Sequence, residues 1–195
     1  MTLPDVAWIV VHDLRIRGRV DPATVDDAVL DTMITAELVE QRARTLVLTP
    51  TGRLAHEQWA RVPPDSDQER ALRRAYESFL PLNRDLLVLC HDWQVRPGGA
   101  PNDHRDTHYD WSVIDRLHAL DERAGGVARR AARALDRLTH HRVRLEHALV
   151  RVDAGEHEWF TSPRIDSYHT VWMHLHEDLL LALGIERASE PDELT

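Results

Sequence analysis

A helical stripe near the C-terminus constrains the fold more than any other feature of the sequence. In residues 163–184, PRIDSYHTVWMHLHEDLLLALG, six side chains are spaced four, three, four, three and four residues apart. This spacing predicts one helix that starts at Pro163, ends at Gly184 and buries the face carrying the six, with Glu177 and Asp178 falling elsewhere. The six residues are Ile165, His169, Trp172, His176, Leu179 and Leu183.

Two histidines, His169 and His176, therefore point into the predicted core. A buried imidazole requires hydrogen-bond partners or a metal ion. The two histidines lie about 10 Å apart along the helix axis, too far for both to bind one ion. No Cys-x-x-Cys or His-Glu-x-x-His zinc motif is present, and a metal would need ligands such as His104, Asp103 or Asp106. The sequence therefore predicts neither a metal ion nor a cofactor.

The composition is typical of a globular chain and excludes several protein classes. Apolar residues make up 43% and charged residues 29% of the 195 positions. No apolar run approaches the roughly 20 residues of a membrane span. The N-terminus lacks the basic segment of a secretory signal and Cys90 is the single cysteine, which favours a cytoplasmic location. The net charge of −9 argues against broad nucleic-acid binding.

The order of patterns predicts a mainly α protein with two parts. Residues 4–17 and 21–38 read as helices, residues 46–48 as a short strand, and residues 49–52 as a turn that starts another helix. The Pro-Pro-Asp segment 63–65 is a linker. We expect a small degenerate winged-helix part over residues 1–62, an α-helical bundle over 66–187, and an acidic tail over 188–195.

The winged-helix expectation comes from residues 37–53, ELVEQRARTLVLTPTGR. This stretch resembles the strand–wing–strand end of MarR-like winged-helix regulators, and the resemblance implies DNA binding through a recognition helix. The sequence departs from that pattern, because the segment before Leu38 is about one helix too short. Residues 20–40 also carry six acidic residues and no arginine, which disfavours contact with phosphates. A packing or homodimerisation role for the wing is therefore the favoured interpretation.

The second part is predicted to consist of long helices. Ser66 and Glu69 match a capping box before a helix in which Pro81 should cause a kink or a break. A polar loop over residues 96–108 follows, and then a helix over 109–123 that Gly125 and Gly126 should end. Two more helices are expected over 127–139 and 140–154.

Several stretches of this part share a second resemblance. FLPLN at 79–83, NDH at 102–104 and DSYHTVW at 166–172 are similar to a helical domain that follows a winged helix in some proteins of high-GC bacteria. Those proteins are MarR-like regulators or occur beside pyruvate phosphate dikinase-like enzymes. The resemblance implies an architecture and no particular reaction.

Polar residues interleaved with aromatic ones predict a ligand pocket between these helices. The alternative is a satisfied buried network, such as Asp92 with His169, which only fixes the packing. In the loop, Asp106 is expected to cap the next helix, whereas His104 is a candidate proton carrier. The candidate pocket residues are Asn83, Asp92, Trp93, Gln94, Asp103, His104, Tyr109, Tyr168, His169, Trp172 and His176.

Three functions remain open from the sequence. The first is a regulatory or small-molecule-sensing protein of winged-helix ancestry, with weak or no DNA binding. The second is a cofactor-independent enzyme that uses histidine and aspartate as acid and base in the same pocket. The third is a DNA-binding repressor. No phosphate loop or standard hydrolase motif favours a particular reaction, so whether the protein is an enzyme stays open.

Overall fold

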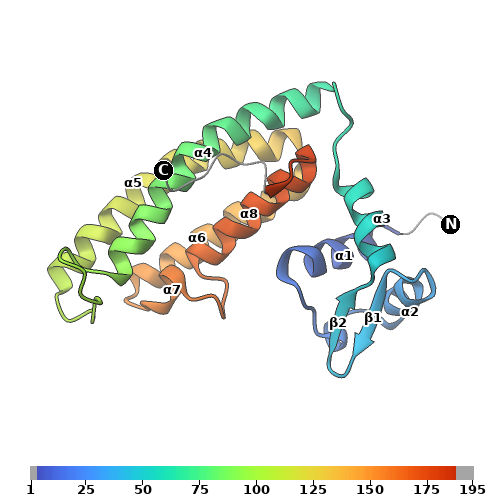
Figure 1. The fold of residues 1–195 in the computed structure, drawn as a ribbon, viewed down its shortest axis with the longest axis horizontal. Coiled ribbons are helices and arrows are strands. Elements are labelled where there is room, and N and C mark those ends of the chain that lie inside the picture. Colours follow the sequence, from blue (N-terminus) through green and yellow to red (C-terminus); the bar gives the residue numbers. More distant parts are fainter. Residues whose placement is uncertain (1–3, 188–195) are drawn as a thin grey trace. The chain divides into compact units, whose positions relative to one another are not determined.

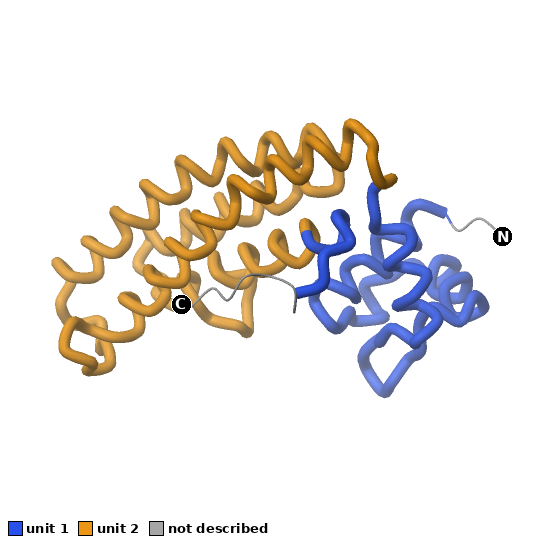
Figure 2. Tube along the Cα trace, turned by 45° about the horizontal axis from the view of Figure 1, so that its top comes forward, with its two compact units in different colours: residues 1–62, 180–188 blue, residues 63–179, 189–195 orange. Residues whose placement is uncertain are grey.

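The computed structural model describes residues 4–187 and is mainly helical, with one small antiparallel sheet, which confirms the predicted fold class (Figure 1). The chain divides into two compact units (Figure 2). The first unit extends to Val62 and takes in the C-terminal segment from Leu180. The second unit, the helical unit, runs from Pro63 to Leu179. The predicted tail over 188–195 lies outside the described residues.

The first unit contains, in order, a helix, a short helical pair, a hairpin and a closing helix. The pair replaces the single helix predicted over 21–38, because two aspartates each cap a separate segment. Asp21 accepts from the backbone N–H of Ala23, and Asp26 accepts from that of Ala28. The elements are α1 (Asp5–Arg17), η1 (Pro22–Thr24), α2 (Asp27–Thr35), β1 (Val39–Arg42), β2 (Thr45–Leu48) and α3 (Pro50–Ala60).

The hairpin pairs Val39 with Leu48 and Arg42 with Thr45, and an isolated bridge joins Val20 to Leu46. One face of this hairpin closes the core of the unit against α1 and α2. The second strand is predicted from its own residues, and the first only through the family resemblance, because just Val39 of β1 is buried. The buried core consists of Ala7, Val11, Leu14, Met33, Leu38, Val39 and Leu46.

In the helical unit, the two longest helices pack along each other (Figure 1). Its first helix begins as the capping box predicts, since the backbone N–H of Glu69 donates to Ser66 Oγ at 3.0 Å. Pro81 lies inside this helix without dividing it. The elements are α4 (Asp67–Gln94), α5 (Thr107–Ala134), η2 (Asp136–Leu138), α6 (Thr139–Asp153), α7 (Glu158–Thr161) and α8 (Tyr168–Leu183).

The prediction that Gly125 and Gly126 end a helix is wrong, because α5 continues through both to Ala134. Gly125 is buried, and a Cβ there would lie 3.3 Å from an Arg129 nitrogen and 3.7 Å from the Arg142 guanidinium. Close packing around the glycine thus overrides its weak intrinsic helix preference.

The predicted C-terminal helix is shorter than expected, since α8 begins at Tyr168 rather than at Pro163. Gly184, with φ of +63°, follows its last residue as predicted. The expected inward face is buried from Trp172 to Leu183, but Asp178, placed off that face by the spacing, is also fully buried. No helix in residues 4–187 combines the length and apolar character needed to cross a bilayer.

Candidate functional site

The predicted pocket residues fall into two groups that lie at different levels of the helical unit. Asn83 belongs to one group and Trp93 to the other. They are ten residues apart on α4, which corresponds to about 15 Å along the helix axis. The structure therefore does not gather the predicted residues around one cavity.

The first group forms a buried packing network. The indole N–H of Trp172 donates to Asn83 Oδ1 at 2.7 Å, and both side chains are buried. The Trp172 ring stacks on Phe79 with centroids 4.8 Å apart. His176 is 1% exposed and lies 5.1 Å from the same Phe79 ring. These contacts fix how α8 packs on α4.

Tyr168 belongs to the same network and is fully buried. Its hydroxyl donates to Asp121 Oδ1 at 2.8 Å, and Asp121 is in turn paired with Arg142 through two hydrogen bonds. Burial, followed by the Asp121 charge, raises the pKa of Tyr168 well above its usual value. This tyrosine is thus a neutral donor that satisfies a buried carboxylate.

Asp92 does not join His169, in contrast to the network considered from the sequence. Its carboxylate pairs with Arg116 at 2.7 Å, and its backbone carbonyl accepts from the Tyr109 hydroxyl at 2.7 Å. His169 is half-buried on α8, and burial lowers its pKa from the usual value. The Asp92 carboxylate already has a counter-charge in Arg116, so its charge does not require a contact with His169.

His169 makes a testable contribution to acid sensitivity. Because its folded-state pKa is depressed, the unfolded chain takes up the proton first as the pH falls below about 6.5, so stability decreases there. We expect the melting temperature to fall between pH 7 and 5, and to fall less in His169→Gln. Thermal denaturation followed by circular dichroism at each pH measures this. An equal decrease in both proteins would show that another group is responsible.

The second group, which we call the helix-end cluster, consists of Trp93, Asn102, His104, Asp110 and His157. Trp93 is 2% exposed and forms its floor. The Trp93 ring centroid lies 4.5 Å from that of His104 and 5.4 Å from that of His157. Asn102 donates to Asp110 Oδ1 at 2.8 Å and to the Trp93 carbonyl at 3.1 Å. The end of α4, the loop before α5 and the α6–α7 connection therefore meet here.

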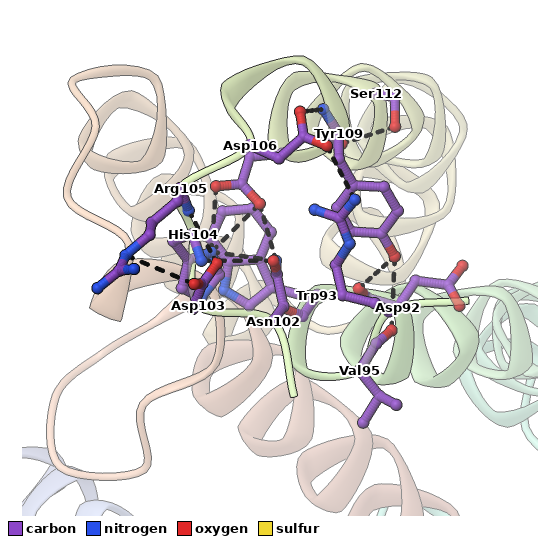
Figure 3. A network of polar contacts seen from close by, with 12 residues as sticks. Asp92, Trp93, Val95, Asn102, Asp103, His104, Arg105, Asp106, Tyr109 and Ser112 are labelled. Carbon is purple, nitrogen blue, oxygen red and sulfur yellow. Dashed lines mark hydrogen bonds and ion pairs between the residues drawn. The ribbon is translucent and has the colours of Figure 1, made fainter. Parts of the chain in front are cut away.

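The loop that carries His104 is held on both sides (Figure 3). The backbone N–H of Asn102 donates to the Gln94 carbonyl at 2.8 Å, although the Gln94 side chain is exposed. Asp106 caps α5 through the Tyr109 N–H, as predicted, and pairs with Arg96. The Arg96 hydrogen bond, followed by the backbone N–H of Tyr109, lowers the pKa of the Asp106 carboxyl.

His104 adopts a left-handed backbone conformation with φ of +56°. This conformation is uncommon for a residue with a Cβ and persists only where surrounding contacts impose it. It directs the imidazole toward the buried Asp110, whose two oxygens each lie 3.2 Å from His104 Nδ1. The neighbouring Asp103, also a predicted pocket residue, is exposed and accepts from the Arg105 N–H.

Asn102 orients this arrangement because its amide has only two hydrogens. Those hydrogens are used by the Trp93 carbonyl and by Asp110 Oδ1. His104 Nδ1, 3.2 Å from Asn102 Nδ2, is then left to face the aspartate as a donor, or to offer a lone pair to a cation. The cluster can therefore exchange a proton or bind a positive ion.

The sequence predicts His104 and Trp93 as pocket residues, but it does not predict His157. This residue follows the turn at Gly155, more than 45 positions from His104, and no motif spacing joins the two. Asn102 lies in the predicted polar loop and Asp110 directly after it, but neither is among the predicted pocket residues. Only the packing of α6 and α7 near α5 brings the three segments together.

A separate shallow groove on α4 and α5 contains none of the predicted residues. Its lining includes Asp85 and Arg123, which pair with each other at 2.8 Å. Arg116, also in the lining, pairs with Asp92. Its charged groups thus already have partners, and it is the weaker candidate for a binding site.

No protein-family model, curated protein or solved structure matches this chain. The resemblance to MarR-like regulators consequently stays a prediction from the sequence.

Proposed function

We propose that this protein is a regulatory protein of winged-helix ancestry that senses a small ligand at its helix-end cluster. The observation that carries the proposal is the convergence of His104, Asp110 and His157 from three segments, with ligating atoms within 4.8 Å of one another. Such convergent polar groups around an aromatic floor are typical of binding sites. The single cysteine, Cys90, supports a cytoplasmic location for this sensor.

The charge of the first unit supports a role other than strong DNA binding. In the winged-helix interpretation, helix α2 corresponds to the recognition helix, and Asp27 and Asp31 on it are exposed. In the hairpin, Arg42 pairs with Glu40. A carboxylate on the helix that would enter the groove is repelled by the phosphates.

A DNA-binding assay tests this part of the proposal. We expect the protein to bind a duplex from its own upstream region no more tightly than a scrambled duplex in fluorescence anisotropy. Changing both aspartates, Asp27→Asn and Asp31→Asn, should increase non-specific affinity, most of all at low salt, because repulsive charge is removed. Specific binding by the wild type that Arg53→Ala abolishes would favour a repressor instead.

Exposed apolar side chains support self-association through the first unit. Val6 and Ile9 on α1 are 48% and 60% exposed, and Leu54 on α3 is 60% exposed. Large apolar groups of this kind are frequent in dimer interfaces. Light scattering after size-exclusion chromatography should give the mass of a dimer, and the mass of a monomer would remove homodimerisation from the proposal.

A ligand screen tests the sensing role. We expect at least one small polar compound to raise the melting temperature of the wild type and to have no effect on Asn102→Ala, which loses the orienting amide. Changing the packing-network residue Asn83 to alanine should lower stability while the ligand effect remains. A screen without any such compound would contradict the proposal.

A second candidate function is acid–base catalysis at the same cluster. The 3.2 Å separation between His104 Nδ1 and the Asp110 oxygens favours it, because a carboxylate that orients an imidazole is the usual arrangement of a general base. Turnover of a compound from the screen, lost in Asp110→Asn while binding persists, would favour an enzyme over a sensor.

A further inference from the structure

Asp110 differs from the other buried aspartates of the helical unit in the partners it meets. Asp121 pairs with Arg142 at 2.7 Å, and Asp178 pairs with Arg137 at 3.0 Å. Asp110 is 3% exposed, and within residues 4–187 the structure places no arginine against it. Its carboxylate contacts the neutral amide of Asn102 and the imidazole of His104. A buried carboxylate in such surroundings lacks a permanent counter-charge.

Two imidazoles and one carboxylate are the groups that a transition-metal ion prefers in this situation. We propose that His104, Asp110 and His157 bind a divalent transition-metal ion, with Zn²⁺ as the ion best suited to two nitrogen ligands and one oxygen ligand. This inference deepens the proposed function, on which it rests for its biological role, by naming the chemical class of the ligand. The sequence by itself predicts no metal ion, and this proposal replaces that prediction.

The separations between the ligating atoms are close to those of a coordinated ion. Tetrahedral coordination at about 2.1 Å places neighbouring ligand atoms about 3.4 Å apart. His104 Nδ1 and Asp110 Oδ2 are already 3.2 Å apart. The other separations among the three groups are at most 4.8 Å. His157 belongs to the short connection between α6 and α7, so a movement of up to about 1.4 Å in its side chain, the difference between 4.8 Å and 3.4 Å, completes the set.

The surroundings support coordination as well. Asn102 donates to Asp110 Oδ1, which leaves Oδ2 to face the ion and holds the carboxylate in one orientation, as groups behind metal ligands do. Trp93 lies against both imidazole rings and stacks on Phe160 with centroids 4.6 Å apart. This aromatic floor excludes water from one side of the ion.

Three protein ligands leave a fourth position open for water or a small anion. Structural zinc sites use four protein ligands, whereas sites that exchange a ligand keep one position open. The proposed site is therefore of the open type, which suits a sensor that responds to the ion or to an anion bound with it.

Metal titration of the full chain, without a histidine tag and after treatment with a chelator, tests this inference. We expect one Zn²⁺ per chain by isothermal titration calorimetry, and the visible bands of tetrahedral Co²⁺ when cobalt replaces zinc. Asp110→Asn and His157→Ala should each weaken Zn²⁺ binding by at least about 100-fold, because each removes a direct ligand. Asn102→Ala should weaken it by about 10- to 100-fold.

His118→Ala is the matched control. His118 and Asp153 form a histidine–aspartate pair on the surface, 2.8 Å apart. Their side chains are 42% and 40% exposed. Zn²⁺ affinity should be unchanged in this variant. Circular dichroism should show that all variants keep the wild-type helical content. If Asp110→Asn unfolds, His157→Ala still tests the metal site, because His157 lies in a connection between helices rather than in the core.

Two results would overturn the metal site, namely no Zn²⁺ binding by the wild type, or equal binding by the wild type and His157→Ala. If organic compounds from the screen still act through Asn102, the sensing proposal survives the loss of the metal site. If Zn²⁺ binds as described but changes neither DNA binding nor self-association, the metal site stands and the regulatory proposal is contradicted. The two proposals can therefore fail separately.

Discussion

Replacing Asp178 with alanine is expected to lower the free energy of unfolding by about 3–5 kcal/mol, the range for breaking a buried ion pair. Asp178 is fully buried on α8. Its Oδ1 accepts from Arg137 Nε at 3.0 Å, and its Oδ2 lies 3.1 Å from Nε2 of the buried His141. The carboxylate thus joins α8 to η2 and α6. Without it, the Arg137 side chain, which is only 17% exposed, loses this buried ion pair.

The measurement is thermal denaturation at neutral pH, where this loss corresponds to a decrease of about 10 °C in melting temperature. Asp153→Ala is the control, because Asp153 also pairs with a histidine, His118, but at the surface. An exposed pair contributes less than about 1 kcal/mol, so this variant should melt close to the wild type. Equal losses in the two variants would show that burial of the Asp178 pair is not what stabilises the fold.

Replacing Gly52 with alanine is expected to destabilise the first unit by roughly 2–3 kcal/mol. An added Cβ would lie 1.9 Å from the Leu38 carbonyl oxygen and 2.8 Å from its carbon. Both are backbone atoms, and that oxygen also accepts from the backbone N–H of Thr49 at 3.1 Å. The start of α3 must therefore move away from the strand, which breaks the cap that Thr49 provides to the Gly52 N–H.

Near-ultraviolet circular dichroism during denaturation includes a signal from this unit, because Trp8 and Trp59 stack within it with centroids 5.4 Å apart. Gly126→Ala is the matched control. It lies inside α5, and a Cβ there would meet only the Arg130 side chain, at 3.5 Å. Alanine favours a helix over glycine, so this variant should be more stable by up to about 1 kcal/mol. If Gly52→Ala is as stable as the wild type, the Leu38 backbone moves aside without a loss of folding free energy, and the prediction is wrong.

Features determined over a few residues could be predicted accurately. The two ends of α1, the start of α3, the capping box at Ser66 and the glycine after α8 all follow from neighbouring side chains and backbone groups. The division of the 21–38 segment is not predicted, because Asp26, which caps α2, was counted only among the acidic residues that disfavour contact with phosphates.

Features that depend on distant partners were predicted less well. The spacing along α8 correctly indicated which face is apolar, but it placed Asp178 outside the core. Helical periodicity describes one element and contains no information about the arginine and histidine that α6 and η2 bring to meet it. The same limit applies to Gly125, whose tolerance within a helix depends on its neighbours in space.

Local sequence was sufficient to determine the helical class, the second strand of the hairpin and several caps, because hydrogen bonds between near neighbours and side-chain periodicity act along the chain. The choice between a packing network and a binding site required the fold. His157 is far from His104 in sequence, and only the placement of α6 and α7 brings its ring centroid within 4.7 Å of the His104 ring. Attraction between a buried carboxylate and groups from other elements depends on distance through space, which the order of residues does not specify.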